Sequence, residues 1–311
     1  MPVFFEKTKG YMFMKRKKSL TSASNLEIFA FIFPALLLFC VFVVYPLIPE
    51  LIISFQESDG FTNKGFVGLE NYISVIKSNT FWLTHKNTYL VVLLSLFGGL
   101  PISMLFALLM DATSPKVRNF FKFVSVFPAV LAQTVVGRLW TAIYQSDWGV
   151  INTFLRTIGL ESWTRVWLAE QSTVMIAITI AYLWQYIGLN GLLFYAGIKS
   201  IPKTYYEAAE IDGGGFFKNS IYITIPLLQD MVKYVLLTST LGSLGMFSYV
   251  NIMTSGGPGT ISRTVMYEIY MLAFSKSDFG ASCALSVIFL IQCIIAARII
   301  NKYVAKEAIT Y

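Results

Sequence analysis

Six stretches of mostly apolar residues, each long enough to cross a lipid bilayer, limit how this chain can fold. A helix crosses a bilayer with about 20 apolar residues, and runs of that kind cover residues 28–53, 88–110, 120–144, 172–198, 234–253 and 279–298. Only 13% of the residues are charged and 56% are hydrophobic, which leaves too few polar side chains for a soluble domain of this size. We therefore expect an all-α polytopic membrane protein with six transmembrane helices.

The basic residues predict the orientation of these helices. Of the 24 Lys and Arg residues, sixteen fall in the two tails and in the segments near 116 and 199–233, and seven fall in the other three loops. Because basic residues are enriched in cytoplasmic segments, both termini should be cytoplasmic, and "MKRKK" at 14–18 should anchor the N-terminal tail. Arg138 lies inside the third run and is expected to reach the membrane interface with its long side chain.

One membrane domain is the simplest organisation. It should comprise an N-terminal cytoplasmic tail (1–27), a six-helix domain (28–298) with a cytoplasmic loop at 199–230, and a C-terminal cytoplasmic tail (299–311). Prolines in the first two runs should kink helices that neighbouring helices then stabilise; they are Pro34, Pro46, Pro49 and Pro101.

Composition argues against several classes of function. The net charge of +7 comes from residues at the edges of apolar runs and not from a basic stripe, so no nucleic-acid partner is expected. Cys40, Cys283 and Cys293 form no CxxC pair, which supports neither a metal site nor a disulfide framework. No Gly-Lys dipeptide occurs, so the chain has no Walker A loop for ATP, and no catalytic residues are predicted.

The polar segment "YYEAAEIDGGG" at 205–215 predicts a corner between two short helices. Thr204 and Glu207 have the spacing of a capping box at the start of a helix. The glycines at 213–215 can end that helix and reverse the chain. A second short helix should follow from about 216 to 223 and stop before Pro226.

The segment is similar to the EAA motif of the permease subunits of binding-protein-dependent ABC importers. The residues at the motif's positions are Glu207, Ala208, Ala209, Gly213, Ile223, Ile225 and Pro226, and Asp212 lies in the spacer before Gly213. Ile225 replaces the family's Leu, Gly214 replaces a common Ala, and Ser220 stands where an aromatic residue is frequent. "FPALLLFCVFVVYPLIPELIISF", "FVGLENY", "WGVINTFL" and "TSGGPGTISRTVMYEIYMLAF" also resemble the maltose-type, oligosaccharide subfamily, and its first permease subunit in particular.

This resemblance implies a type I ABC importer permease fold in a bacterial cell membrane. It implies a second homologous permease, two ATPase subunits that bind ATP and Mg, an extracellular solute-binding protein and a carbohydrate substrate, with no cofactor in this chain itself. The EAA residues would dock in a groove of the ATPase and couple its motion to the membrane helices. "TSGGPG" would contribute to docking the binding protein.

Two apolar runs carry polar faces that could line a path for sugar. Sugars offer hydroxyl groups and apolar ring faces, which suit aromatic, hydroxyl and amide side chains. The candidates, supported by helical spacing and by the resemblance, are Tyr182, Gln185, Tyr186 and Asn190 in the fourth run and Ser239, Ser243, Met246 and Asn251 in the fifth. Polar residues between membrane helices also commonly bond to neighbouring helices, and that alternative stays open.

Two other functional classes are weighed against an importer subunit. A stand-alone secondary transporter of a small polar solute should carry intramembrane carboxylates or paired helix breaks, and neither is evident. A membrane enzyme should cluster catalytic groups, yet the single histidine, His85, is expected in an external loop without a partner. Its replacement should leave transport intact.

Overall fold

The computed structural model describes residues 25–304, in two compact units that meet in sequence between Pro49 and Glu50. The first unit holds α1 (Asn25–Phe39), a π-helical segment (Cys40–Val44) and the start of α2 (Tyr45–Ile53). The predicted anchor at 14–18 and most of the C-terminal tail lie outside the described residues.

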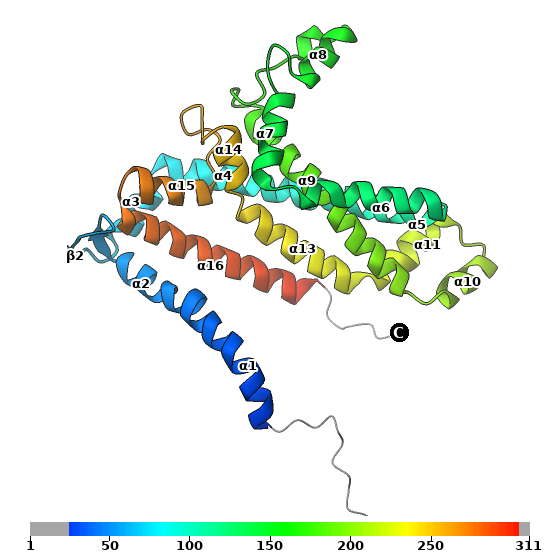
Figure 1. The fold of residues 1–311 in the computed structure, drawn as a ribbon, viewed down its shortest axis with the longest axis horizontal. Helices are drawn as coiled ribbons and strands as arrows, with labels where there is room; N and C mark the ends of the chain where they lie inside the picture. Colours follow the sequence, from blue (N-terminus) through cyan, green and yellow to red (C-terminus); the bar gives the residue numbers. More distant parts are fainter. Residues whose placement is uncertain (1–24, 305–311) are drawn as a thin grey trace, which may run out of the picture. The chain divides into compact units, whose positions relative to one another are not determined.

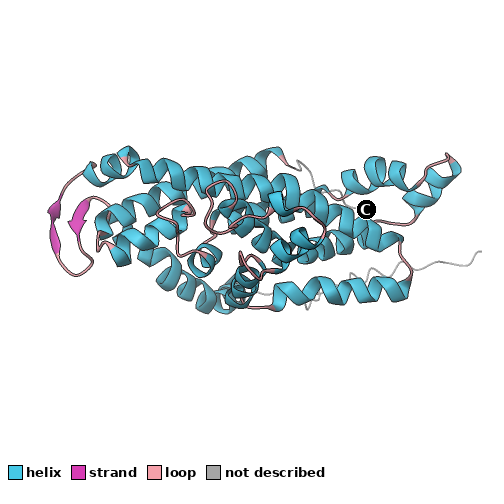
Figure 2. Ribbon diagram, turned by 90° about the horizontal axis from the view of Figure 1, so that it is seen from above, coloured by secondary structure: helices cyan, strands magenta, loops and turns pink. Residues whose placement is uncertain are grey.

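The second unit is helical apart from one hairpin among the described residues (Figures 1 and 2). The strands are β1 (Gln56–Ser58) and β2 (Asn63–Phe66). The helices are α3 (Glu70–Lys77), α4 (Asn79–Leu94), α5 (Leu100–Ala112), α6 (Pro115–Val130), α7 (Gln133–Ile143), α8 (Val150–Thr157), α9 (Val174–Ser200), α10 (Thr204–Ile211), α11 (Phe216–Asn219), α12 (Ile225–Leu227), α13 (Gln229–Leu244), α14 (Ser248–Met253), α15 (Val265–Tyr270) and α16 (Phe279–Tyr303). Shorter π segments (Ser95–Gly99, Ser220–Thr224, Met271–Ser275) and a 3-10 turn (Glu161–Trp163) complete it.

The hairpin turn is held by a carboxylate. The β1 and β2 strands pair antiparallel, with Gln56 opposite Phe66. Asp59 accepts hydrogen bonds from the backbone N–H of Thr62 at 2.7 Å, from its hydroxyl at 2.7 Å and from the N–H of Phe61 at 2.9 Å. These bonds favour the ionised carboxylate and lower the pKa of Asp59 to about 2.

Four single helices are long and apolar enough to span a membrane: Leu26–Ile53, Asn79–Ala112, Val174–Ser200 and Phe279–Tyr303. Two further pairs are sharply bent, Pro115–Val130 with Gln133–Ile143 at 99° and Phe216–Leu227 with Gln229–Leu244 at 72°. Each pair can account for one span, which gives up to six. The predicted third run, 120–144, lies within the first pair apart from its last residue, but it contains a bend that was not expected. The predicted fifth run, 234–253, continues past the end of α13 at Leu244 into α14, so its boundary there is wrong.

Pro101 and Pro226 lie in continuous helices because a π-helical segment precedes each of them. Proline has no N–H and its ring clashes with the carbonyl four residues earlier. That carbonyl belongs to Phe97 for Pro101 and to Tyr222 for Pro226, and both lie inside π segments, where the hydrogen-bond register is shifted. Among the described residues, the sharp bends fall elsewhere, at 131–132 and at Leu228.

The α9 helix packs against α5, α6 and α13. Its apolar residues enter two buried clusters, one with Ile178 and Ala181 and one with Phe194 and Ile198. Because α9 contacts several spans along its length, its polar residues are fixed relative to those spans.

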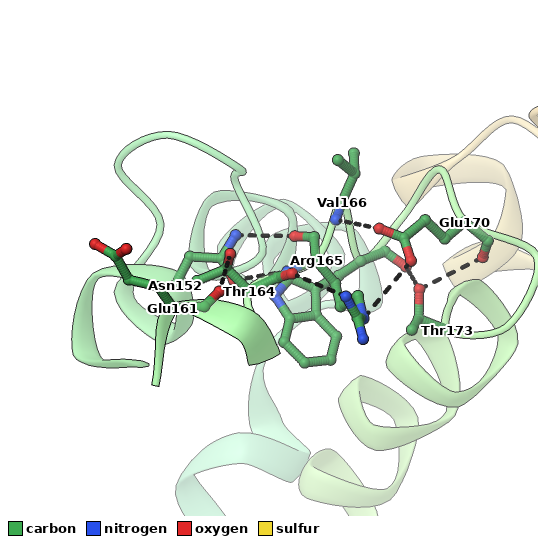
Figure 3. Close-up of polar contacts among 8 residues, drawn as sticks. Asn152, Glu161, Thr164, Arg165, Val166, Glu170 and Thr173 are labelled. Carbon is green, nitrogen blue, oxygen red and sulfur yellow. Dashed lines mark hydrogen bonds and ion pairs between the residues drawn. The ribbon is translucent and has the colours of Figure 1, made fainter. Parts of the chain in front are cut away.

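The segment between α7 and α9 is organised around one buried amide (Figure 3). Asn152 on α8 is 2% exposed. Its amide group donates to the carbonyl of Arg165 at 2.9 Å, and its oxygen accepts from the indole N–H of Trp167 at 2.8 Å. Glu170 accepts from the backbone N–H of Val166 at 2.8 Å. These bonds tie α8 to the chain that leads into α9.

His85 is not in a loop, contrary to expectation. It lies in α4 with a side chain buried to 6% exposure. Its Nδ1–H donates to the carbonyl of Phe81 at 2.7 Å, and its Nε2 accepts from the amide of Gln292 on α16 at 3.1 Å. His85 therefore bridges two long helices. Arg138 is exposed on α7.

Candidate functional site

A cavity of about 320 Å³ lies between α9 and α13, and we call it the polar cavity. The residues that line it are Ser95, Gly99, Gln133, Tyr182, Leu183, Tyr186, Ile187, Leu189, Asn190, Leu193, Tyr234, Thr238, Ser239 and Gly242. The cavity wall thus combines hydroxyl groups, amides and tyrosine rings with leucine and isoleucine side chains. Such mixed surfaces bind ligands that have both hydroxyl groups and apolar faces.

Hydrogen bonds join the helices across the polar cavity. The amide of Gln133, at the start of α7, donates to the hydroxyl of Tyr186 on α9 at 3.0 Å. The amide of Asn190 on α9 donates to the hydroxyl of Ser239 on α13 at 3.2 Å. The rings of Tyr182 and Tyr186 lie with their centroids 5.0 Å apart, which places two aromatic surfaces side by side.

Four of the eight predicted path residues line the polar cavity, and four do not. Gln185 is 2% exposed, and its amide donates to the carbonyl of Leu131 at 2.7 Å while its oxygen accepts from the hydroxyl of Tyr249. Ser243 is fully buried and donates to the carbonyl of Ser239 at 2.7 Å. The remaining two lie outside the lining as well: Met246 is buried in the core, and Asn251 is exposed on α14.

Sequence reasoning missed Gln133, Tyr234 and Thr238. On α13 the lining residues Tyr234, Thr238 and Gly242 repeat every four positions, so they form one helical face. Of the predicted residues on α13, only Ser239 lines the cavity. The sequence thus contained the signal for this face, since its residues repeat every four positions. Thr238 and Gly242 lie one position before the predicted residues Ser239 and Ser243. Gln133 could not be found this way because it follows the 99° bend.

The predicted glycine corner is present. The α10 helix ends at Ile211, and Gly213 has a φ of +74°. The N–H of Gly213 donates to the carbonyl of Glu210 at 3.1 Å, and the N–H of Gly214 donates to the carbonyl of Ala209 at 2.7 Å. These two bonds make a Schellman motif, which ends a helix with a left-handed residue.

A Cβ at position 214 would not fit this corner. It would lie 2.7 Å from the carbonyl oxygen of Ala209 and 2.5 Å from the side-chain oxygen of Asn219. Gly214, which departs from the family's common Ala, therefore suits the close turn that this chain makes.

Two local predictions about this segment are wrong. Thr204 makes no capping bond, because it is already the first helical residue and Lys203 precedes it as the N-cap. The second helix does not stop before Pro226 but continues from Phe216 to Leu227. The π segment before the proline explains the continuation, as argued above.

Residues 199–230, here called the EAA loop, connect the two helices that line the polar cavity. The α9 helix ends at Ser200 and α13 begins at Gln229. Leu228, at the bend into α13, is 3% exposed, and a Cβ on Gly197 would lie 2.8 Å from its side chain. Leu228 is thus packed against the end of α9, so the EAA loop and both cavity helices are mechanically linked.

The two arms of the EAA loop are also bonded to each other. The hydroxyls of Tyr206 and Thr224 lie 3.0 Å apart. Glu207 and Ala208 are exposed. Large apolar side chains project from the same loop, with exposed fractions of 87% for Ile211, 77% for Phe217 and 77% for Tyr222. Exposed apolar side chains on a loop that is stabilised by internal hydrogen bonds are typical of a protein-binding surface.

The segment "TSGGPGTISRT" is fixed to α4. The amide of Asn87 donates to the carbonyls of Ile261 at 2.8 Å and Arg263 at 2.9 Å. The hydroxyl of Thr88 accepts from the N–H of Val265 at 3.0 Å. These hydrogen bonds fix the segment to α4, so the loop has a defined surface.

Comparisons with known proteins agree with these features. A family described as the binding-protein-dependent transport system inner membrane component matches residues 99–309. The arabinooligosaccharides transport system permease protein AraP of Bacillus subtilis is 31% identical over 88% of this chain and 87% of its own length. The sn-glycerol-3-phosphate transport system permease protein UgpA of Salmonella choleraesuis is 30% identical over 88% of this chain and 92% of its own.

A solved structure has the same fold. A chain of a bacterial ABC transporter involved in the import of the acidic polysaccharide alginate superposes with a TM-score of 0.76 at 22% identity, over 89% of this chain and 95% of its own. The chain described here belongs to the family of inner membrane components of binding-protein-dependent transport systems. It is a multi-pass membrane permease of the type I ABC importer fold.

Proposed function

We propose that this chain is one of two permease subunits in an ATP-driven importer, and that it moves a carbohydrate delivered by an extracellular solute-binding protein. The polar cavity carries the proposal, because its tyrosine rings, hydroxyls and amides suit the faces and edges of sugar rings. The family description, which names a binding-protein-dependent system, supports the partner. The similarity to a permease named for arabinooligosaccharides supports the cargo.

The proposed mechanism is alternating access driven through the EAA loop. Displacement of α10 passes through the bond between Tyr206 and Thr224 into the helix 216–227. That helix meets α13 at Leu228. Because α13 contributes Thr238 and Ser239 to the polar cavity, such a displacement changes the cavity wall.

ATP hydrolysis belongs to partner chains in this proposal. The sequence lacks a Walker A loop, so two ATPase subunits would bind ATP and Mg and receive the EAA loop. The exposed apolar side chains of Ile211, Phe217 and Tyr222 suit such a partner. The distribution of basic residues supports a cytoplasmic location for this loop and for both termini in a bacterial cell. The loop "TSGGPG" would then face the binding protein.

Charge reversal in the EAA loop tests the coupling. The permease gene is deleted from the source bacterium, and the carbohydrate whose uptake is lost identifies the cargo. In this proposal Glu207 contacts a cationic group of the ATPase, and loss of one partner of a buried ion pair typically costs about 2–5 kcal/mol. Complementation with Glu207→Lys should therefore restore the protein to the membrane but less than about a tenth of the uptake. Glu161→Lys, the same reversal in the segment before α9, is the control and should restore uptake fully. Normal uptake with Glu207→Lys would contradict coupling through this residue and would favour a stand-alone transporter.

A further inference from the structure

The polar cavity has a consistent chemical character that narrows the cargo. Its polar side chains, among the residues that line it, are all neutral hydroxyls or amides; they are Ser95, Gln133, Tyr182, Tyr186, Asn190, Tyr234, Thr238 and Ser239. We propose that the carbohydrate passing this subunit is uncharged, and that sugar acids and sugar phosphates are excluded. This proposal rests on the function proposed above.

The hydrogen bonds within the cavity match a hydroxyl better than an anion. Gln133 and Asn190 use their N–H groups to bond Tyr186 and Ser239, and among the described residues no hydrogen bond uses their amide oxygens. The amide oxygens of Gln133 and Asn190 can therefore accept a hydrogen bond from a ligand, and the hydroxyl groups of Tyr186 and Ser239 can donate one. A sugar hydroxyl both donates and accepts, so it can satisfy both kinds of group. A carboxylate or phosphate only accepts, so it would leave the amide oxygens opposed to its own negative charge.

The surroundings of the cavity do not compensate an anion either. A charge inside a membrane protein is stable only when it is paired. Lys199, near the end of α9, pairs with Asp111 and lies over the ring of Tyr195. Lys233 precedes the lining residue Tyr234 on α13, but it is not among the lining residues. Inside the polar cavity, an anionic cargo would therefore meet only neutral side chains of this subunit.

The aromatic surfaces provide the remaining recognition. Tyr182 and Tyr186 offer adjacent rings, and the C–H face of a sugar stacks on such rings without needing charge. The relatives show that the distinction matters, since the family includes a permease named for arabinooligosaccharides and another named for sn-glycerol-3-phosphate.

Consumption of a mixed sugar supply tests the proposal. Wild-type and permease-deletion cells are grown with neutral oligosaccharides from hydrolysed plant polymers and chitin, together with alginate oligosaccharides and glycerol-3-phosphate. Mass spectrometry then follows each compound in the medium. We expect the deletion to slow consumption of a neutral oligosaccharide only, by at least about tenfold. Slower consumption of an anionic compound would overturn the proposal of an uncharged cargo but would agree with the proposed importer function. Unchanged consumption of every carbohydrate would overturn the proposed function as well.

A pair of variants tests the charge of the cargo at the cavity itself. Asn190→Asp and Asn190→Ser both remove the amide that donates to Ser239, but only the first adds a negative charge. For the cargo found above, both should reduce uptake at equal membrane levels, and Asn190→Asp should reduce it further by at least about tenfold, because its carboxylate is unpaired among neutral groups. Uptake that falls no more in Asn190→Asp than in Asn190→Ser would show that the cavity tolerates an unpaired negative charge, and would overturn the exclusion of anionic cargo.

Discussion

At the scale of single residues, Gln185 shows how a polar side chain in a membrane helix can stabilise a bend in another. The 99° turn between α6 and α7 leaves the carbonyl of Leu131 without a helical partner, and the amide of Gln185 donates to it at 2.7 Å. The same side chain accepts from Tyr249 on α14. Helical spacing and the family resemblance predicted a place for Gln185 in the sugar path, because neither can tell a residue that faces a cavity from one that faces a neighbouring backbone.

Replacing Gln185 should therefore act on stability. Gln185→Leu keeps the approximate volume but leaves the Leu131 carbonyl and the Tyr249 hydroxyl without this partner, at about 1–3 kcal/mol for each buried group. We expect the midpoint of thermal aggregation in mild detergent to fall by roughly 5 °C or more. Gln171→Leu, at an exposed position, is the matched control and should change the midpoint little. Equal midpoints for the two variants would argue against the role assigned to Gln185.

Gly242 tests whether the polar cavity is the transport path. A Cβ at this position would lie 3.0 Å from the hydroxyl of Tyr182, so Gly242→Leu would fill part of the cavity. Overpacking typically costs about 1–3 kcal/mol, and the same free energy taken from binding corresponds to a loss of roughly five- to 150-fold in cargo affinity. Gly98→Leu is the control, because a Cβ there meets no atom within 4 Å. Uptake by Gly242→Leu at the rate of Gly98→Leu would place the path elsewhere.

At the scale of helices, hydropathy predicted where the long spans lie but not where they break. Each of the runs at 172–198 and 279–298 corresponds to a single helix: the first is shifted by two residues, to Val174–Ser200, and the second extends further, to Tyr303. The bend at 131–132 depends on packing partners such as Gln185, which lie far away in sequence, so no local pattern could reveal it. The glycine corner was predictable because its cause is local: Gly213 has a positive φ that other residues adopt with strain.

A series of three glycine variants tests the corner. Gly213→Ala would strain a left-handed backbone by about 1–2 kcal/mol, and Gly214→Ala would press against the carbonyl of Ala209. Gly215→Ala is the control, since position 215 has a φ of −100° and open space around its Cβ. We expect uptake to fall in the first two variants and to persist in the third, with ATPase activity of the purified importer no longer stimulated by cargo in the first two. Equal uptake in all three would show that the corner geometry does not matter for coupling.

At the scale of the whole molecule, the account depends on one connection. The EAA loop joins α9 to α13, and the same two helices line the polar cavity. A partner that moves the loop would thus move both walls of the proposed path. In the proposed importer, the partner and the opposite half of the path belong to other chains, so the central claim concerns an assembly.

The most direct test is to purify the tagged chain from its native membrane in mild detergent and identify every stoichiometric partner by mass spectrometry. The account predicts two copies of an ATPase with a Walker A loop and one second permease that carries its own EAA motif. Recovery of this chain alone, or as a homo-oligomer without an ATPase, would contradict the account and support a transporter that works by itself.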